Sequence, residues 1–474
     1  MKLLNARMKL VTFAVASAVA GGAMVSTPAQ AMNVSQNNVG QVLLSPYYTV
    51  KNGFDTFFSV VNTTNATAIF KIRFREALNS RETRDFNVIL SPYDVWNGGV
   101  TSTGVGATIR TFDNSCTSPD KPSWTSTGTG GYQVDMTNAN FSGAKTDGAD
   151  ATLARTQDGY FEVILMGVST MDPDNPANVI EYNAKHVAGV PRDCAKVDTA
   201  VGTVVGIAAN TVNFVPPSNI LKGHVTYINV ANGTAVDAEP TAIENFAPLK
   251  KIIFPPSDSS PSLADGESSP GGNPGLLISN GANMTVNAAA PEDIVSALLS
   301  ADNVINEYAS GSGAATTWVV TAPTKHFYTD KLETAVVKAP FANLFTGTSC
   351  DQVTLAWYDR NEATATSGTH FSPYTPGSDS LCYEANLIDF NGASVFGAGV
   401  NHKAIDTTSV GTSGWVKLSL TNTGNLSTDK TTVTGLPVIG FAAIVRDTGS
   451  AATNYGSSEM HTTSSGVHQA TGPQ

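Results

Sequence analysis

Asparagine–glycine and aspartate–glycine pairs divide most of this chain into short segments rich in β-branched and aromatic residues. Both members of such a pair tolerate the positive φ angles that tight hairpins require. The pairs are Asn52-Gly53, Asn97-Gly98, Asp147-Gly148, Asp158-Gly159, Asn232-Gly233, Asn280-Gly281 and Asn391-Gly392. Many short strands joined by glycine turns predict an all-β fold class, with antiparallel β-sandwich (Ig-like) domains.

The segments between these pairs alternate as strands do. Phe70, Ile72 and Phe74 alternate with three cationic residues, which predicts a strand with one dry face and one solvated face. Only the stretch 291–308 combines a leading proline with apolar spacings of three and four, which predicts a helix. Residues 241–246 can add one more helical turn. One or two short helices are too few for a parallel α/β core, which needs a helix between successive strands.

The first 31 residues have the pattern of a secretory signal peptide. Three cations within the first nine residues precede an apolar stretch from Leu10 to Ala20, and the segment ends in Ala29-Gln30-Ala31. Cleavage after Ala31 starts the mature chain at Met32. No later segment approaches the roughly 20 apolar residues that a membrane helix needs. We therefore expect no transmembrane segment and an extracellular or cell-surface location in a bacterium.

The chain is long enough for two cores, since domains usually contain about 100 to 200 residues. We expect a signal peptide over 1–31, a β-sandwich domain over 32–220, a second one over 221–448 and a disordered tail over 449–474. The stretch 257–274 is dense in Ser, Pro, Gly and Asp, which predicts a mobile loop in the second domain.

The charge of the chain narrows the range of partners. Three of the 27 Lys and Arg lie in the leader, so the mature chain carries 24 of them against 39 Asp and Glu, a formal net charge of −15. This acidity argues against nucleic acid and anionic lipid as partners. Charged residues make up only 14% of the chain, and uncharged polar residues take their place. Such surfaces suit extracellular assemblies.

Four cysteines in an exported chain predict disulfides. The simplest of the three connectivities joins Cys116 to Cys194 and Cys350 to Cys382, each pair within one expected domain. The chain has no C-x-x-C pair and no Cys/His spacing typical of a zinc site.

Candidate sites are few. Asp172 and Asp174, in the segment Asp172-Pro-Asp-Asn-Pro176, can offer oxygens to Ca²⁺, although such a segment is more often an ordinary turn. No Gly-x-Ser-x-Gly motif is present, while a triad from distant positions stays open. The five tryptophans can form a carbohydrate platform, although core positions are more common in sandwiches; they are Trp96, Trp124, Trp318, Trp357 and Trp415.

Several strings resemble a family of secreted proteobacterial proteins that are described only as cell surface proteins. They are Ser59-Val-Val-Asn-Thr-Thr64, Asp85-Phe-Asn-Val-Ile-Leu-Ser-Pro-Tyr-Asp-Val-Trp96, Asp158-Gly-Tyr-Phe-Glu-Val-Ile-Leu-Met-Gly167, Gly189-Val-Pro-Arg-Asp-Cys194, Ala315-Thr-Thr-Trp-Val-Val-Thr-Ala-Pro-Thr-Lys325 and Leu436-Pro-Val-Ile-Gly-Phe441. The strings are spread over most of the mature chain. The resemblance implies a location and an architecture, and it transfers no catalytic residue, ligand or cofactor.

These observations favour a structural or interaction protein without catalysis, such as an S-layer-like, matrix or adhesin subunit. Its expected partners are other copies of itself or components of the cell envelope, and no cofactor is expected apart from the calcium alternative. A secreted module that binds carbohydrate or metal is the first alternative, and a hydrolase on a β-scaffold is the second. The first requires exposed aromatics or clustered oxygens, and the second a nucleophile beside a base.

Overall fold

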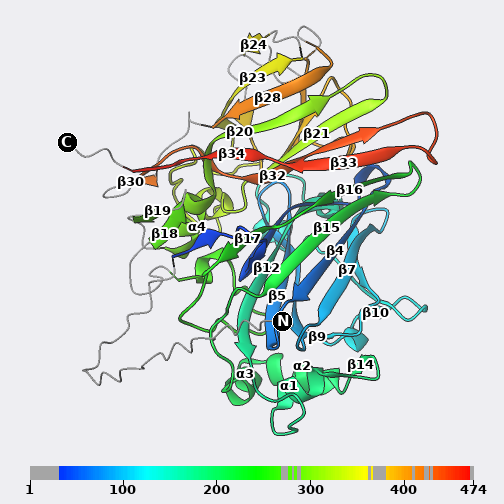
Figure 1. Ribbon diagram of the computed structural model, residues 1–474, viewed down its shortest axis with the longest axis vertical. Coiled ribbons are helices and arrows are strands. Elements are labelled where there is room, and N and C mark those ends of the chain that lie inside the picture. The colour runs from blue at the N-terminus through cyan, green and yellow to red at the C-terminus, as the bar shows by residue number, and fades with distance from the viewer. Residues whose placement is uncertain are drawn as a thin grey trace, which may run out of the picture.

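The computed structural model describes residues 31–267, 276–279, 282–285, 290–360, 364–366, 380–407, 411–420, 426–427 and 431–469. Four large sheets dominate the fold and form two stacked β-sandwiches, which confirms the expected fold class (Figure 1). The pairings between the strands named below are antiparallel, except that β26 and β27 are parallel. Residues 1–30, which contain most of the expected signal peptide, lie outside the described residues.

The first sandwich packs two sheets face to face around rings such as Phe58, Phe74 and Trp96. In sheet order, its first sheet contains β1 (Asn33–Val34), β17 (Thr241–Glu244), β3 (Val42–Thr49), β12 (Asp158–Ser169), β5 (Thr67–Glu76), β6 (Glu82–Leu90) and β9 (Cys116–Ser118). Its second sheet contains β10 (Thr125–Ser126), β11 (Tyr132–Asp135), β8 (Ala107–Thr111), β7 (Val95–Ser102), β4 (Asp55–Asn62), β15 (Leu221–Asn229) and β16 (Thr234–Ala238), with β2 (Val39–Gly40) paired to β15.

The second sandwich is built in the same way around Trp318, Trp357 and Phe390. Its first sheet contains β24 (Thr364–Thr366), β23 (Thr354–Asp359), β28 (Ser413–Ser419), β20 (Ser300–Ala309) and β31 (Leu436–Pro437), with β34 (Thr462–Ser465) paired to β20. Its other sheet contains β27 (His402–Ile405), β26 (Ala385–Phe390), β21 (Ala314–Thr321), β32 (Ile439–Arg446) and β33 (Tyr455–Met460).

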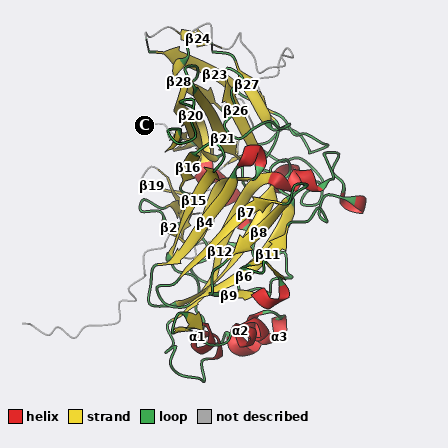
Figure 2. Cartoon of the chain, turned by 90° about the vertical axis from the view of Figure 1, so that its right-hand side faces the viewer, coloured by secondary structure: helices red, strands yellow, loops and turns green. Residues whose placement is uncertain are grey.

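Smaller elements complete the described part of the chain. The short sheets are β13 (His186–Val187) with β14 (Val190–Pro191), β18 (Leu276–Ser279) with β19 (Ala282–Thr285), β22 (Asp351–Gln352) with β25 (Ser380–Leu381), and β30 (Thr431–Val433) with β29 (Leu426–Ser427) and β35 (Val467–Gln469). The helices are α1 (Val179–Ala184), α2 (Cys194–Val201), α3 (Val204–Asn210), α4 (Pro291–Leu299) and α5 (His326–Thr329). Helices α1 to α3 gather at one end of the first sandwich (Figure 2). Among the described residues, no helix is both long enough and apolar enough to cross a membrane.

The structure corrects the expected domain organisation. The first sandwich does not end at residue 220, because β15 pairs with β4 and β17 pairs with β3. The expected helix over 291–308 ends at Leu299, and the following residues form β20, whose apolar side chains alternate across a sheet. The prediction of a disordered tail over 449–474 is also wrong for residues 449–469, the part that the structure describes. Strands β33, β34 and β35 pair with β32, β20 and β30.

Strand β5 is confirmed, but its solvated face is not. Lys71 and Arg73 are buried, because residues 255–259 cross over them. The Lys71 ammonium donates to the carbonyl of Asp258 at 2.6 Å and pairs with Asp85 at 3.1 Å. Leu263 is also buried, and the carbonyls of Asp258 and Ser259 accept from Lys71 and Arg73, so the described part of this stretch is anchored to the fold, contrary to the expected mobile loop. Residues 268–274 of that loop lie outside the described residues.

The two sandwiches share a continuous apolar contact. Phe396 of the second sandwich lies between Tyr47 and Tyr227 of the first, with 5.4 Å between ring centroids in both cases. Phe441 on β32 stacks on Tyr227 at 5.5 Å. Edge strand β16 also lies against β33, where the Asn454 amide donates to a carbonyl of the β15–β16 turn.

Candidate functional site

A groove crosses the outer face of the second sheet of the first sandwich, over strands β4, β7 and β8. This face is turned toward the viewer in Figure 2. The groove encloses about 500 Å³, within the range of roughly 300 to 1,000 Å³ of small-molecule sites. We call it the β7 groove, and its lining residues used below are Phe57, Asp94, Val95, Asn97, Gly99, Arg110, Phe112, Asp113 and His186.

Two glycines in the middle of β7 shape the floor of this groove. Gly98 faces the core, and a Cβ there would overlap the Trp96 ring. Gly99 faces outward between Phe57 on β4 and Arg110 on β8, its partners in the same row of the sheet. The missing side chain lets the Phe57 ring lie directly over Gly99, where it covers the backbone and borders the groove. Glycine in a strand interior often marks close approach by a ligand or another backbone.

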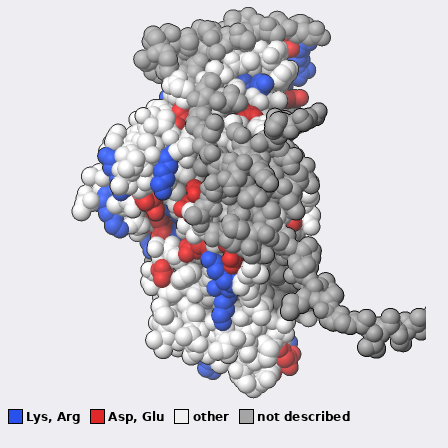
Figure 3. All heavy atoms as spheres, turned by 90° about the vertical axis from the view of Figure 1, so that its left-hand side faces the viewer, with Lys and Arg blue, Asp and Glu red and all other residues white. Residues whose placement is uncertain are grey.

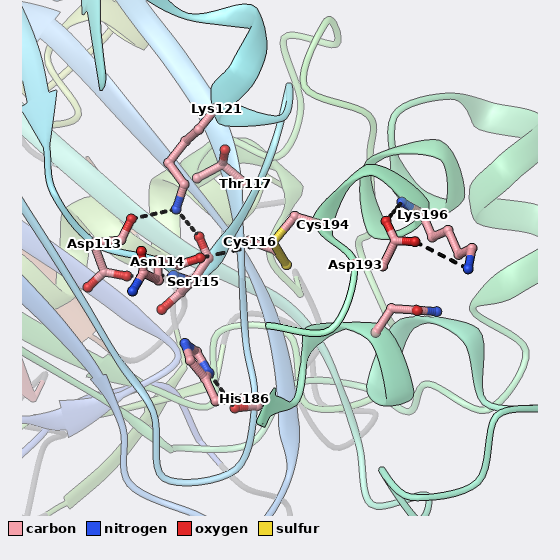
Figure 4. The surroundings of a disulfide bond; sticks show 12 residues. Asp113, Asn114, Ser115, Cys116, Thr117, Lys121, His186, Asp193, Cys194 and Lys196 are labelled. Atoms are coloured by element: carbon pink, nitrogen blue, oxygen red, sulfur yellow. Dashed lines mark hydrogen bonds and ion pairs between the residues drawn. A yellow bond between two sulfur atoms is a disulfide. The ribbon is translucent and has the colours of Figure 1, made fainter. Parts of the chain in front are cut away.

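Residues 111–115 form the wall at one end of the groove. The Asp113 carboxylate accepts from the backbone N–H of Asn97 at 3.1 Å and from that of Ser115 at 2.7 Å. Lys121 lies behind this wall, and its buried ammonium donates to the carbonyls of Asp113 and Ser115 (Figure 4). Burial lowers the pKa of Lys121 to about 8, while nearby Asp113 acts in the opposite direction. Lys121 thus fixes the backbone of the wall.

The Cys116–Cys194 disulfide ties this wall to the helical end of the sandwich. It joins β9 to the first residue of α2, and its Cα atoms are 5.0 Å apart (Figure 4). The second disulfide joins Cys350 to Cys382, so both expected pairings are confirmed. His186, on β13, closes the groove from the helical side, with its Nδ1 3.5 Å from an oxygen of Asp94. Burial raises the pKa of Asp94, and His186 opposes that shift.

Two serine–histidine–aspartate groups lack the geometry of a hydrolytic triad. Near the groove, Ser91 Oγ and an Asp94 oxygen lie 3.4 Å and 3.5 Å from the same nitrogen of His186, Nδ1. In a triad the nucleophile and the carboxylate contact opposite nitrogens of the imidazole, so that a proton can pass through the ring.

The same arrangement recurs in the second sandwich. Asp389 and Ser394 both contact Nδ1 of His402, at 2.8 Å and 3.4 Å. Nε2 of His402 is buried and has no hydrogen-bond partner. Neither group therefore provides a histidine placed between an acid and a nucleophile.

The expected calcium ligands do not line the groove. Asp174 is exposed and pairs with Lys185 at 2.5 Å and with Arg192 at 2.7 Å. Hydrogen bonds from these two cations lower the pKa of Asp174. The Asp172 carboxylate accepts the backbone N–H of Asp174 at 2.9 Å, as in an ordinary Asx turn. Within the described ranges, no three His, Cys, Asp or Glu side chains form a metal-binding group.

The tryptophans do not form a platform. Trp96, Trp318 and Trp357 are fully buried, and Trp124 is nearly so. Trp415 is partly exposed and stacks on Tyr358 at 4.2 Å. The aromatic side chains at the groove are phenylalanines.

A larger cavity of about 710 Å³ lies between the sandwiches, lined by Val34, Leu298 and Val438 among others. Strand β1 and helix α4 border it and also contact β18, whose side chains lie outside the described residues.

Sequence reasoning missed the β7 groove because it assigned Asn97-Gly98 to a turn. A usable signal was present: Trp96 and Val100 flank Asn97-Gly98-Gly99, and both are strand-forming residues. Comparison of the chain with protein families, curated proteins and solved structures found no match. The resemblance to secreted cell surface proteins therefore stays a prediction.

Proposed function

We propose that this chain is an exported bacterial protein that acts at the cell surface or outside the cell by binding, without catalysis. The observation that carries the proposal is the β7 groove, an open hollow with exposed apolar and polar side chains and no relay for nucleophilic attack. Interaction with the cell envelope, or with other copies of the chain, is the function that such a surface supports best.

One further observation supports export, and a second argues against nucleic acid as a partner. Both pairs of cysteines are disulfide-bonded, and such bonds persist mainly in oxidising compartments. On the face shown in Figure 3, the described Lys and Arg side chains are mixed with Asp and Glu among a majority of uncharged residues. Surfaces of this kind do not present a basic field to nucleic acid.

Fractionation of the native cells tests this proposal. Intact cells are treated with an external protease, and the mature chain is followed by immunodetection, with a cytosolic protein as the protected control. We expect the chain in the surface or medium fraction, degraded by the external protease. A parallel sample washed with a calcium chelator shows whether a divalent cation holds the chain to the cell. Recovery from the periplasm, untouched by the protease, contradicts the surface location.

A further inference from the structure

The β7 groove cannot bind a ligand by adding a strand to the sheet. Strands β4, β7 and β8 all lie in the interior of the sheet, with neighbours on both sides. Most of their backbone N–H and C=O groups are therefore paired within the sheet. At Asn97, which lines the groove, the N–H donates to the Asp113 carboxylate and the C=O accepts from the Thr111 hydroxyl, so these groups are also occupied. Peptides that bind by β-augmentation need an unpaired sheet edge. A ligand here must be recognised by the side chains of the outer face.

The apolar part of the groove consists of unusually exposed aromatic rings. Phe57 is 44% exposed and Phe112 is 61% exposed, and Val95 lies with them at 37%. A flat phenyl face offers the kind of surface on which the C–H face of a sugar ring packs. Burial of a phenylalanine side chain is favourable, so covering these rings supplies a driving force for binding.

The polar part consists of planar groups with two or three hydrogen-bonding atoms each. They are the Asp94 and Asp113 carboxylates, the Asn97 amide and the Arg110 guanidinium. Such groups can each pair with two neighbouring hydroxyls of a sugar. Arg110 is held in place by Gln133, whose side-chain oxygen accepts from it at 3.0 Å. The polar groups therefore place hydrogen-bond donors and acceptors in the same groove as the rings.

The charges of the groove nearly cancel. Two carboxylates face one guanidinium and the His186 imidazole. An anionic ligand such as a phosphate would meet Asp94 and Asp113, and a cationic ligand would meet Arg110. The polar rim also disfavours a lipid chain, whose burial requires apolar walls. The ligand that satisfies both the rings and the rim is uncharged, rich in hydroxyls and has apolar faces.

We propose that the β7 groove binds a neutral oligosaccharide. Phe57 and Phe112 pack against the C–H faces of sugar units, and Asn97, Asp113 and Arg110 hydrogen-bond to their hydroxyls. This inference rests on the proposed function, because it names the ligand class of the same groove. It assigns no catalytic role to His186 and requires no metal ion.

An oligosaccharide array followed by isothermal titration tests the inference. The mature chain is applied to neutral hexasaccharides of glucose, mannose, xylose, galactose and N-acetylglucosamine, with oligogalacturonate as the acidic comparison. We expect binding of at least one neutral oligosaccharide. Phe57→Ala and Phe112→Ala should each weaken it about tenfold, as expected for a central aromatic contact worth about 1.4 kcal/mol. Tyr455→Ala, an equally exposed aromatic on the other sandwich, should have no effect.

Three outcomes overturn the inference. No neutral oligosaccharide binds on the array, only the acidic oligomer binds, or binding survives the loss of both phenylalanine rings. If Phe57→Ala fails to fold, Phe112→Ala decides alone, because its largely exposed ring adds little to the core. A chain found on the cell surface that binds none of these sugars defeats the ligand class and leaves the proposed function standing.

Discussion

Single residues at the β7 groove determine its shape and make the free energy of unfolding depend on pH. Lys121 is buried, and burial lowers its pKa to about 8 from an ordinary value of 10.5. The unfolded chain therefore binds more protons than the folded chain between these two pH values. The contribution of Lys121 to the free energy of unfolding therefore increases as the pH rises from about 8 to 10.5, and it decreases as the pH drops toward 8.

We predict that Lys121→Met removes this dependence. Between pH 8 and 9.5 the wild type should gain roughly 2 kcal/mol relative to the variant, measured by urea unfolding at both pH values. Buried tyrosines such as Tyr47 and Tyr160 also have raised pKa values, but they act equally in both proteins. The variant should also be less stable overall by about 1 to 3 kcal/mol, because the carbonyls of Asp113 and Ser115 lose their donor. Parallel pH curves for the two proteins contradict this account.

Within strand β7, the two neighbouring glycines should respond differently to the same substitution. Gly98→Ala places a methyl group into the Trp96 ring and should lower the free energy of unfolding by about 1 to 3 kcal/mol. Gly99→Ala points outward, where the nearest ring atom of Phe57 is 3.2 Å from the new Cβ, and it should cost less. Thermal unfolding of the two variants measures the difference. Equal losses would mean that Gly99 is not on the open face.

Strands β33 to β35 allow a second test at the level of elements. They cover the edge of β32 and pair with β20 and β30, and His461 donates from Nε2 to the carbonyl of Val319 at 2.9 Å. A chain that stops at residue 448 loses these ladders, at roughly 1 kcal/mol for each hydrogen bond, and exposes two strand edges. We expect it to be unstable or insoluble on size-exclusion chromatography. A chain that stops at residue 469 is the matched control and should behave like the wild type.

Local patterns in the sequence predicted strands better than they predicted what covers them. Alternation correctly identified β5, but its three cations are buried. Arg75 pairs with the buried Glu162, and residues 255–259 cross Lys71 and Arg73. That contact joins residues nearly 190 positions apart, and no local pattern reports it. The disulfides followed from redox compartment and spacing. The β7 groove was not predicted from the sequence, because Asn97-Gly98 is a dipeptide typical of a hairpin turn. Only the pairing of β7 with β4 and β8 shows that these residues lie inside a strand.

At the scale of the whole molecule, the contact between the sandwiches decides whether they unfold together. Phe396 is fully buried between Tyr47 and Tyr227, and Thr321 donates to the carbonyl of Pro46 at 2.6 Å. Arg81 of the first sandwich also pairs with the buried Asp330, with 2.5 Å between Nη2 and Oδ1. Loss of either sandwich would expose these groups on the other. We therefore expect the chain to unfold in one calorimetric transition, with equal calorimetric and van't Hoff enthalpies.

Phe396→Ala tests this coupling. It removes the ring that both sandwiches share, and it should lower the free energy of unfolding by about 3 to 5 kcal/mol and separate the calorimetric peak into two. Phe390→Ala is the matched control, because Phe390 is equally buried but packs on Tyr308 and Trp318 inside the second sandwich. That variant should melt at a lower temperature and still in one transition. Two transitions in the wild type would show that the aromatic contact does not couple the sandwiches, because each then unfolds without exposing enough of the other to destabilise it.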